Sequence, residues 1–333
     1  MDTNIVILDN GQIRVVLLPR EGGRVQSLYS HRNGIEFLMQ GRHPREQWQA
    51  DVHARFQDGS CAGIEECLPS VVPCGPDTEG GAVPDHGDFW QLGWNIEDSV
   101  TATHVAMHAQ GFSRPLFFRR AFELRESTLT ICYWLQNIGA QPVSFLYAAH
   151  PLLAVDAGDR ILLPTQVKEV RLDYSRGDRF TDTGKNIPWP IHQGIDLSEV
   201  QPEAARTAEV LRSRMSEGWC GVYHTPHQEG IAVRFDTQEL PSLALWICNG
   251  GWPDDGPAPY QYAVAPEPMF CSYSSLAEAQ KAGAAPVLLP GEERSWAIGF
   301  EVTSEKMTQD AFRAFCGNPV ANKEIACFST KDP

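Results

Sequence analysis

The chain has 333 residues, of which 42% are hydrophobic and 21% are charged, as in ordinary globular proteins. Its formal net charge of -15 argues against nucleic acid or an anionic membrane as a partner, because both reward clusters of Lys and Arg. The start of the chain lacks the basic residues and the apolar stretch of a signal peptide, and no apolar run approaches the roughly 18–20 residues of a membrane span. We therefore expect a cytoplasmic protein that makes no membrane contact.

The nine cysteines are scattered, and no two of them form a CxxC pair. This pattern is typical of reduced cysteines that are buried as small hydrophobic residues. Cys61, Cys67 and Cys74 lie closer together, but their spacing does not match the usual zinc ligand patterns. We expect no metal site.

Strand patterns dominate the sequence. Residues 4–9 and 12–18 are β-branched or apolar runs on either side of Asn10-Gly11, which is a strong hairpin signal. Further short runs with turn residues between them cover residues 116–124, 128–137, 143–149, 230–235, 242–248, 260–265 and 294–302. This series predicts an all-β fold, a large antiparallel β-sandwich, which we interpret as a single domain over residues 1–333.

Three segments have helical signals: residues 202–215, 276–282 and 306–315. Ser304 is a plausible N-cap of the last helix, Gly317 marks its end, and we expect it to pack on the outside of the domain. There is no glycine-rich phosphate-binding motif and no alternation of strands with helices, so a nucleotide-binding α/β domain is not expected.

Two histidines are the first candidates for chemistry. His150 precedes Pro151 after an apolar run, so we expect it at the end of a strand, where the ring can point into a cleft. His86 lies in a turn sequence beside Asp85 and Gly87. Either histidine alone could equally be structural. Two imidazoles that meet in the fold could instead form an acid/base set for neutral pH.

Glu267 lies between Pro266 and Pro268 at the end of an expected strand, where the prolines restrict its direction. Loops rich in Gly, Pro and Asp at residues 74–84 and 250–259 lead toward His86 and Glu267, as expected when function is carried by loops on a rigid β scaffold.

Other residues are candidates for binding a sugar. Glu65 and Glu66 are adjacent acids in an apolar segment that could bind sugar hydroxyls or a cation, or could simply be solvated. Asp85 could also accept hydrogen bonds from hydroxyl groups. Aromatic rings can stack on a pyranose, and the candidates are Trp94, Trp246 and Trp252. Some of these side chains could equally lie in the core of the sandwich.

Taken in order, these phrases resemble the aldose 1-epimerase (galactose mutarotase-like) family. The most specific match is the Asn-x-Gly-x-x-Pro turn at residues 137–142 followed by a strand and His150-Pro151. Pro84-Asp85-His86-Gly87 with Trp94, Pro266-Glu267-Pro268 and the early Gly22-Gly23 resemble further family segments. The similarity extends from about residue 5 to about residue 302.

The resemblance implies a β-supersandwich fold and a reaction that opens a sugar hemiacetal and closes it on the other face. Glu267 would be the base, His150 the acid, and His86 a partner of the ring oxygen or of a nearby hydroxyl. No cofactor is implied, and the partner is a small-molecule sugar. Opposite charges in one site would favour Glu267 as a carboxylate and His150 as an imidazolium.

The sequence also departs from the family pattern. Where well-known members have a basic Gly-Arg segment, this chain has Gly63-Ile64-Glu65-Glu66, which argues against a sugar phosphate as substrate. The substrate-binding Asp of the family has no clear counterpart, and Asp254 and Asp255 are two possible positions.

Two alternatives remain open. One is a carbohydrate-binding protein without turnover, although a pure binder needs no matched acid and base. The other is a different reaction on the same scaffold, such as epimerisation of a modified sugar or β-elimination from a uronic acid polymer.

Overall fold

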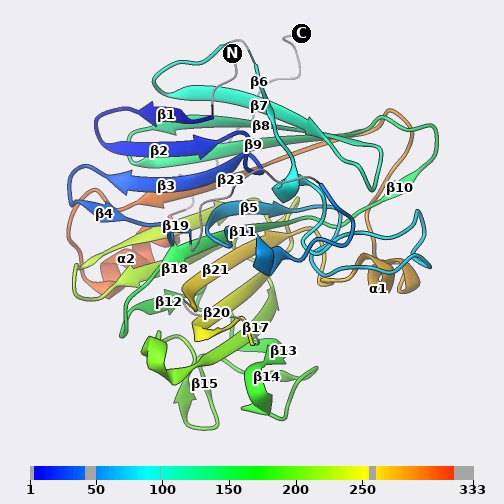
Figure 1. Ribbon diagram of the computed structural model, residues 1–333. Coiled ribbons are helices and arrows are strands. Elements are labelled where there is room, and N and C mark those ends of the chain that lie inside the picture. The colour runs from blue at the N-terminus through cyan, green and yellow to red at the C-terminus, as the bar shows by residue number, and fades with distance from the viewer. Residues whose placement is uncertain (1–3, 42–49, 98, 255–259, 319–333) are drawn as a thin grey trace.

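The computed structural model describes residues 4–41, 50–97, 99–254 and 260–318, in which two antiparallel β-sheets face each other (Figure 1). The first sheet has eleven strands in the order β1-β2-β3-β5-β11-β21-β20-β17-β13-β14, with β4 paired to β3. Their bounds are β1 (Val6–Asp9), β2 (Ile13–Leu18), β3 (Arg24–Ser30), β4 (Ile35–Glu36), β5 (Gly63–Cys67), β11 (Ala148–Ala154), β13 (Glu169–Ser175), β14 (Asn186–Pro188), β17 (Thr207–Arg214), β20 (Ser242–Trp252) and β21 (Gln261–Met269).

The second sheet has eight strands in the order β12-β18-β19-β23-β9-β8-β7-β6. Their bounds are β6 (Asn95–Ile96), β7 (His104–Gln110), β8 (Leu116–Arg125), β9 (Thr128–Asn137), β12 (Arg160–Leu162), β18 (Trp219–His224), β19 (Glu229–Phe235) and β23 (Glu293–Val302). Two short pairs complete the strands: β10 (Val143–Ser144) with β22 (Val287–Leu288), and β15 (Ile191–His192) with β16 (Ile195–Asp196). The predicted all-β antiparallel sandwich is confirmed.

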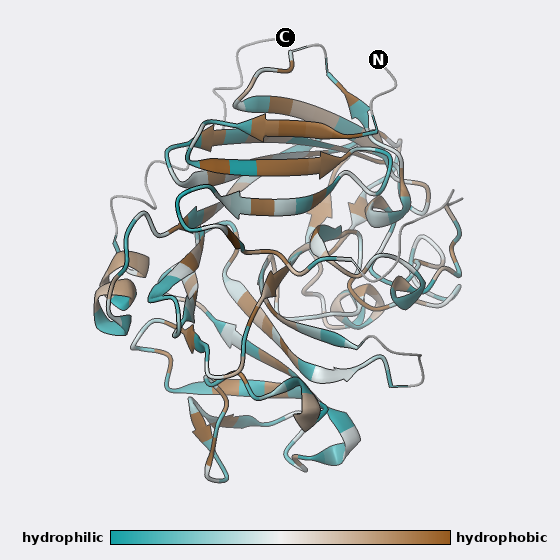
Figure 2. Ribbon diagram, turned by 60° about the vertical axis from the view of Figure 1, so that its left-hand side comes forward, coloured by the Kyte–Doolittle hydropathy of each residue, from teal (hydrophilic) through white to brown (hydrophobic). Residues whose placement is uncertain are grey.

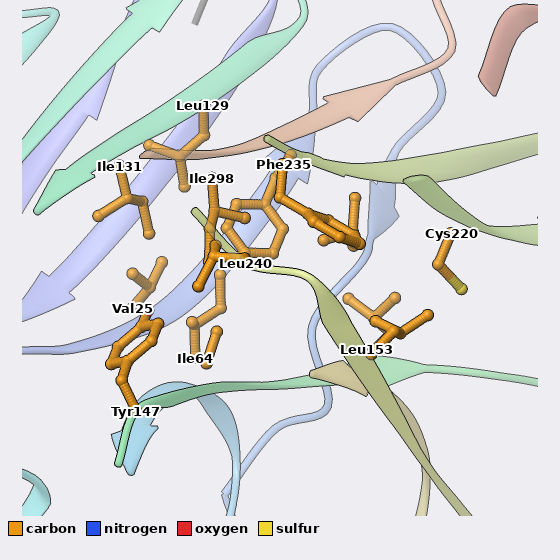
Figure 3. Close-up of a cluster of buried hydrophobic side chains, with 14 of the residues drawn as sticks. Val25, Ile64, Leu129, Ile131, Tyr147, Leu153, Cys220, Phe235, Leu240 and Ile298 are labelled. Carbon is orange, nitrogen blue, oxygen red and sulfur yellow. The ribbon is translucent and has the colours of Figure 1, made fainter. Parts of the chain in front are cut away.

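The core lies between the two sheets. Strand β9 alternates strictly between buried and half-buried residues, as expected for a strand with one face on the core. Alternation of apolar and polar residues is also visible along the upper strands in Figure 2. Val25 and Ile64 of the first sheet join the same buried cluster as Ile131 and Ile298 of the second (Figure 3). Each such aliphatic side chain stabilises the fold by about 1.5–3 kcal/mol.

The central strands β5, β11 and β21 are different, because nearly all of their residues are buried on both faces. Connecting segments therefore cover the outer face of the first sheet at its centre. One of these segments carries a 3₁₀ turn at Phe56–Asp58 and another carries one at Phe89–Gln91. A polar side chain on the outer face of these strands is therefore sheltered from open solvent, and we call this covered face the cleft.

The predicted helix over residues 202–215 is wrong. A 3₁₀ turn covers only Glu203–Ala205, and Thr207–Arg214 forms strand β17. This strand lies inside the sheet, paired with β13 on one side and with β20 on the other. Its Ala, Glu, Leu and Arg residues are good helix formers, but pairing on both edges outweighs a propensity of a few tenths of a kcal/mol per residue.

The other two predicted helices are confirmed as α1 (Leu276–Lys281) and α2 (Gln309–Cys316). Helix α2 starts later than predicted because Thr308, not Ser304, caps it by accepting a hydrogen bond from the Ala311 N–H. Its buried residues Phe312 and Cys316 pack against Trp219 and Tyr223 of β18, on the outer side of the second sheet. No helix in the described ranges is long and apolar enough to cross a membrane.

Seven cysteines in the described ranges are free, and six of these are buried, as predicted. The eighth described cysteine, Cys132, is disulfide-bonded and departs from the prediction.

Candidate active site

A row of polar residues crosses the three central strands of the first sheet. Glu65 of β5 is directly opposite His150 of β11. On the other edge of β11, Ala148 pairs with Met269 of β21. The same register, continued by two residues, places His150 opposite Glu267. Residues directly opposite each other in an antiparallel sheet point to the same face. Ile64 next to Glu65, Ala149 next to His150, and Val264 three residues before Glu267 all belong to the core. Because side chains alternate along a strand, the three polar side chains point to the other face, into the cleft.

His150 and Glu267 are close enough to exchange a proton through one intervening group. The distance from His150 Nε2 to Glu267 Oε1 is 3.7 Å, and their side chains are only 7% and 8% exposed. His150 is not at a strand end as predicted, because β11 continues through Pro151 to Ala154. The regular pairing of β11 with β21 is interrupted between Ala148 and Leu153. Pro151 and the two prolines that flank Glu267 lie in this interval and have no N–H group to donate, which explains how His150 and Glu267 fit inside the sheet.

A separate loop delivers His86 to the same place. The His86 and His150 rings have centroids 5.2 Å apart and meet edge to face. Phe56 stacks on His86 at 3.9 Å and also contacts the edge of His150 at 5.2 Å. His86 has a positive φ of 59°, a conformation that a turn residue adopts at some cost and that functional sites often retain. The three residues predicted as catalytic therefore converge on one cleft.

Asp85 holds the histidine loop rather than projecting freely. One carboxylate oxygen accepts a hydrogen bond from His86 Nδ1 at 2.8 Å, and the other accepts one from the Phe56 N–H at 2.9 Å. Burial acts to raise the pKa of Asp85, but the hydrogen bonds from His86 and Phe56 and the charge of His86 outweigh it and leave the pKa below its ordinary value. Asp85 thus stays a carboxylate that orients His86 and its stacking partner together.

The charge state of the central pair differs from the ionised pair expected from the sequence. Burial raises the pKa of Glu267 to about 8, with Arg212 opposing the shift. Burial, followed by the charge of His86, lowers the pKa of His150 to about 3, with Asp85 opposing. Both groups avoid charge because desolvation is costly. At neutral pH the pair is therefore neutral and holds one proton, carried on Glu267.

Glu66 and Trp94 do not lie in the cleft. Glu66 follows Glu65 on β5 and so points to the opposite face, into the core. Its carboxylate receives Arg120 at 3.1 Å and the hydroxyls of Tyr133 and Tyr147 at 3.0 and 2.9 Å. The buried Trp94 stacks on the Arg120 guanidinium at 3.9 Å. This group ties the two sheets together, so the binding role predicted for both residues is replaced by a structural one.

The other two tryptophans are beside the polar row. Trp246 of β20 lies opposite Ala265, which faces the same way as Glu267, and it packs with Leu152 and Ala265 on the cleft side of the sheet. Trp252 packs against the cluster of Phe56, Cys61 and Trp90 that supports His86. Both are half-buried. A half-buried aromatic ring next to the polar row is suitably placed to contact a sugar.

Of the two candidates for the substrate-binding Asp, the structure describes only Asp254. Asp254 forms an ion pair with Arg176, with 2.8 Å between Asp254 Oδ1 and Arg176 Nε. Asp255 lies outside the described residues. The part of the chain that the structure describes contains no group of three or more His, Cys, Asp or Glu arranged to hold a metal ion.

The sequence patterns missed Phe56 and Arg212. Phe56 belongs to an irregular segment with no motif, and only its hydrophobicity in a polar stretch could have drawn attention to it. Arg212 lies in the segment that the sequence predicts as a helix and the structure shows as strand β17. In β17 it lies opposite Ala244, which in turn lies opposite Glu267, so its guanidinium is on the cleft face, where it opposes the raised pKa of Glu267.

Comparisons with known proteins show the fold. No family model and no curated protein sequence matches the chain. Among solved structures, a protein from Synechocystis sp. PCC 6803 superimposes with a TM-score of 0.64 at 18% identity, covering 90% of this chain and 96% of that one. A galactose mutarotase-like protein from Lactobacillus casei gives 0.62 at 14% identity, covering 90% and 100%. A galactose mutarotase related enzyme from Lactobacillus acidophilus gives 0.63 at 14% identity, covering 92% and 98%. The fold is therefore that of the galactose mutarotase-like β-sandwiches.

Proposed function

We propose that this protein is an aldose 1-epimerase-like enzyme that interconverts the anomers of a free sugar by opening and closing its hemiacetal ring. The observation that supports this most directly is the convergence of His86, His150 and Glu267, from three distant parts of the sequence, on one sheltered cleft. A pure binding site needs hydroxyl partners, but it does not need a buried acid and a buried base side by side.

The proton content of the pair suits the reaction. Ring opening requires one group to take the proton of the anomeric hydroxyl while another gives a proton to the ring oxygen. With pKa values of about 3 for His150 and about 8 for Glu267, the pair holds one proton over a wide range around neutral pH. By resemblance to the family, Glu267 takes the anomeric proton and His150 gives one, which requires the proton to rest on His150 when the substrate is bound.

His86 would hold the ring oxygen or a neighbouring hydroxyl in this scheme. Its Nδ1 is occupied by Asp85, so its Nε2 is the nitrogen left to face a ligand. The hydrogen bond to Asp85 and the stacked Phe56 fix the ring, and a fixed partner contributes more than a mobile one because its orientation is set before the sugar binds.

Polarimetry tests the proposal. Freshly dissolved α-anomers of a panel of neutral aldoses are expected to equilibrate faster with the protein than in the buffer blank, with each positioned proton transfer worth about 10²–10⁴-fold. If calorimetry detects sugar binding while no sugar equilibrates faster than the blank, the protein is a carbohydrate-binding protein and the enzymatic proposal is wrong.

A further inference from the structure

At the end of the polar row beyond Glu65 lies a buried arginine. Val25 of β3 pairs with Ile64 of β5, so Arg24 lies opposite Glu65 on the cleft face. Arg24 is only 4% exposed. The row of outward-pointing residues therefore runs Arg24, Glu65, His150, Glu267 across four neighbouring strands, and the arginine marks its far end.

The hydrogen bonds of Arg24 are incomplete. Its Nη2 contacts Glu21 at 2.9 Å. Its Nε and Nη1 are buried and form no hydrogen bond with any residue that the structure describes. Buried donors without a partner cost stability, so native proteins rarely retain them without a reason.

Ser60 repeats this feature next to Arg24. Both side chains lie beside Gly41. A β-carbon at this glycine would be 3.7 Å from Arg24 Nη1 and 3.8 Å from Ser60 Cβ, so Arg24 and Ser60 are close to the same point. The hydroxyl of Ser60 is also buried without a hydrogen-bond partner among the described residues. Two neighbouring side chains thus present unused polar atoms at one end of the cleft.

Another buried arginine shows what a structural role looks like in this fold. Arg114 is 5% exposed, and its Nη1 and Nη2 donate to four backbone carbonyls, those of Glu79, Gly80, Gly81 and Ser113, at 2.8–3.0 Å. It joins two loops and has no unused terminal nitrogen. Among the residues that the structure describes, Arg24 joins no comparable set of segments, so holding the fold together does not account for it.

We infer that Arg24 and Ser60 bind hydroxyl groups of the substrate, at the part of the sugar farthest from its anomeric carbon. This inference rests on the proposed function. Arg24 is two strands from His150, about 10 Å at the spacing of neighbouring strands, and its long side chain covers part of that distance. A sugar with its anomeric carbon between His150 and Glu267 would extend its remaining hydroxyls toward Arg24.

The local charges select a neutral ligand. Glu21 already balances the charge of Arg24, and Glu65 on the next strand adds a further carboxylate to the same face. A phosphate or carboxylate on the sugar would meet this carboxylate, whereas hydroxyl oxygens can accept from Nε, Nη1 and Ser60 without adding charge. The site therefore takes an uncharged polyol.

The experiment measures binding separately from turnover. Calorimetry uses 1,5-anhydro-D-glucitol and 1,5-anhydro-D-galactitol, which lack the anomeric hydroxyl and cannot react, with their 4-deoxy and 6-phosphate analogues. Wild type is compared with Arg24→Met, Ser60→Ala and the control Arg114→Met, and thermal unfolding is recorded for each. A rise in KM with little change in kcat is expected for Arg24→Met in the polarimetric assay.

Arg24→Met should weaken binding of at least one anhydro sugar by about ten- to a hundred-fold, as expected for loss of hydrogen bonds from a charged donor. Its midpoint temperature should stay the same or rise, whereas that of Arg114→Met should fall with binding unchanged. Tight binding of a 6-phosphate, wild-type binding by Arg24→Met, or no binding of any anhydro sugar by the wild type would overturn the inference. Arg24-dependent binding without any mutarotation would refute the proposed function alone.

Discussion

His150 and Glu267 lie opposite each other on adjacent strands, with Nε2 and Oε1 3.7 Å apart, and burial moves their pKa values in opposite directions. An exposed histidine and glutamate would form an ion pair at neutral pH. Here the cost of desolvation leaves both neutral, and the pair carries one proton between its two titrations. The proposed acid/base chemistry depends on this relationship.

The pH dependence of the rate follows from that single proton. The pair has the proton it needs between about pH 3, where His150 titrates, and about pH 8, where Glu267 titrates. We expect kcat/KM to form a bell with limbs near these values, because kcat/KM reports the free enzyme. Initial rates measured polarimetrically from pH 5 to 9.5, corrected for the buffer rate, should level off below pH 7 and fall above pH 8. A rate that keeps rising through pH 9 would contradict a shared proton.

The same shifts predict how stability changes with pH. The folded pKa of Glu267, about 8, is above its ordinary 4.5, so between pH 6.5 and 8 the folded protein keeps a proton that the unfolded chain has released. Stability should therefore decrease as pH rises through this window, by about 2 kcal/mol for one proton. Between pH 4.5 and 6.5 the shift of His150 from its ordinary 6.5 to about 3 acts in the opposite direction and cancels the effect.

Urea unfolding at pH 6.5 and 8.0 checks this stability prediction. The decrease should disappear in Glu267→Gln and persist in Glu126→Gln, which changes an exposed glutamate far along the chain. Equal slopes in the wild type and Glu267→Gln would show that Glu267 does not titrate in this range.

Asp85 should act through His86. Asp85→Asn weakens the hydrogen bond to His86 Nδ1 and the one from the Phe56 N–H, so the ring and its stacking partner lose their fixed orientation. We expect mutarotation to slow by about ten- to a hundred-fold, the usual size for a hydrogen bond to a charged group, with little change in midpoint temperature. Asp58→Asn, an exposed aspartate paired with Arg55 in the same region, should leave the rate unchanged. Similar rates in the two variants would exclude this positioning role.

Glu66 should matter for stability and not for binding. Glu66→Ala leaves Arg120, which is fully buried, without its carboxylate and should cost about 3–5 kcal/mol in the free energy of unfolding. The rate per folded molecule should stay close to that of the wild type, as measured at a temperature where the variant is folded. A large loss of rate with unchanged stability would place Glu66 back in the cleft.

The fold was predictable because its strands carry their pattern locally. The Asn10-Gly11 hairpin and the alternation in β8 and β9 are set by turn chemistry and by one buried face, both of which can be read over ten residues. Strand β17 has the local pattern of a helix, and what makes it a strand is pairing with β13 and β20, which come from distant parts of the chain. Local propensity contains no information about such partners.

The candidate site was predictable only in part, for a related reason. His86, His150 and Glu267 were found because turn residues and prolines surround them, which marks them individually. Which of two adjacent acids faces the cleft depends on register, so Glu65 and Glu66 could not be told apart. Burial could not be read from the sequence either, and burial is what turned the expected ion pair into a neutral one.

The most direct test of the central claim is the mutarotation rate of Glu267→Gln at pH 7, measured by polarimetry on an aldose that the wild type accepts. The substitution keeps the shape of the side chain and removes its proton, and it should preserve or increase the midpoint temperature because a group that resists ionisation is replaced by a neutral one. We predict a rate at least about a hundred-fold below that of the wild type. A folded Glu267→Gln protein that equilibrates the sugar as fast as the wild type would contradict the account.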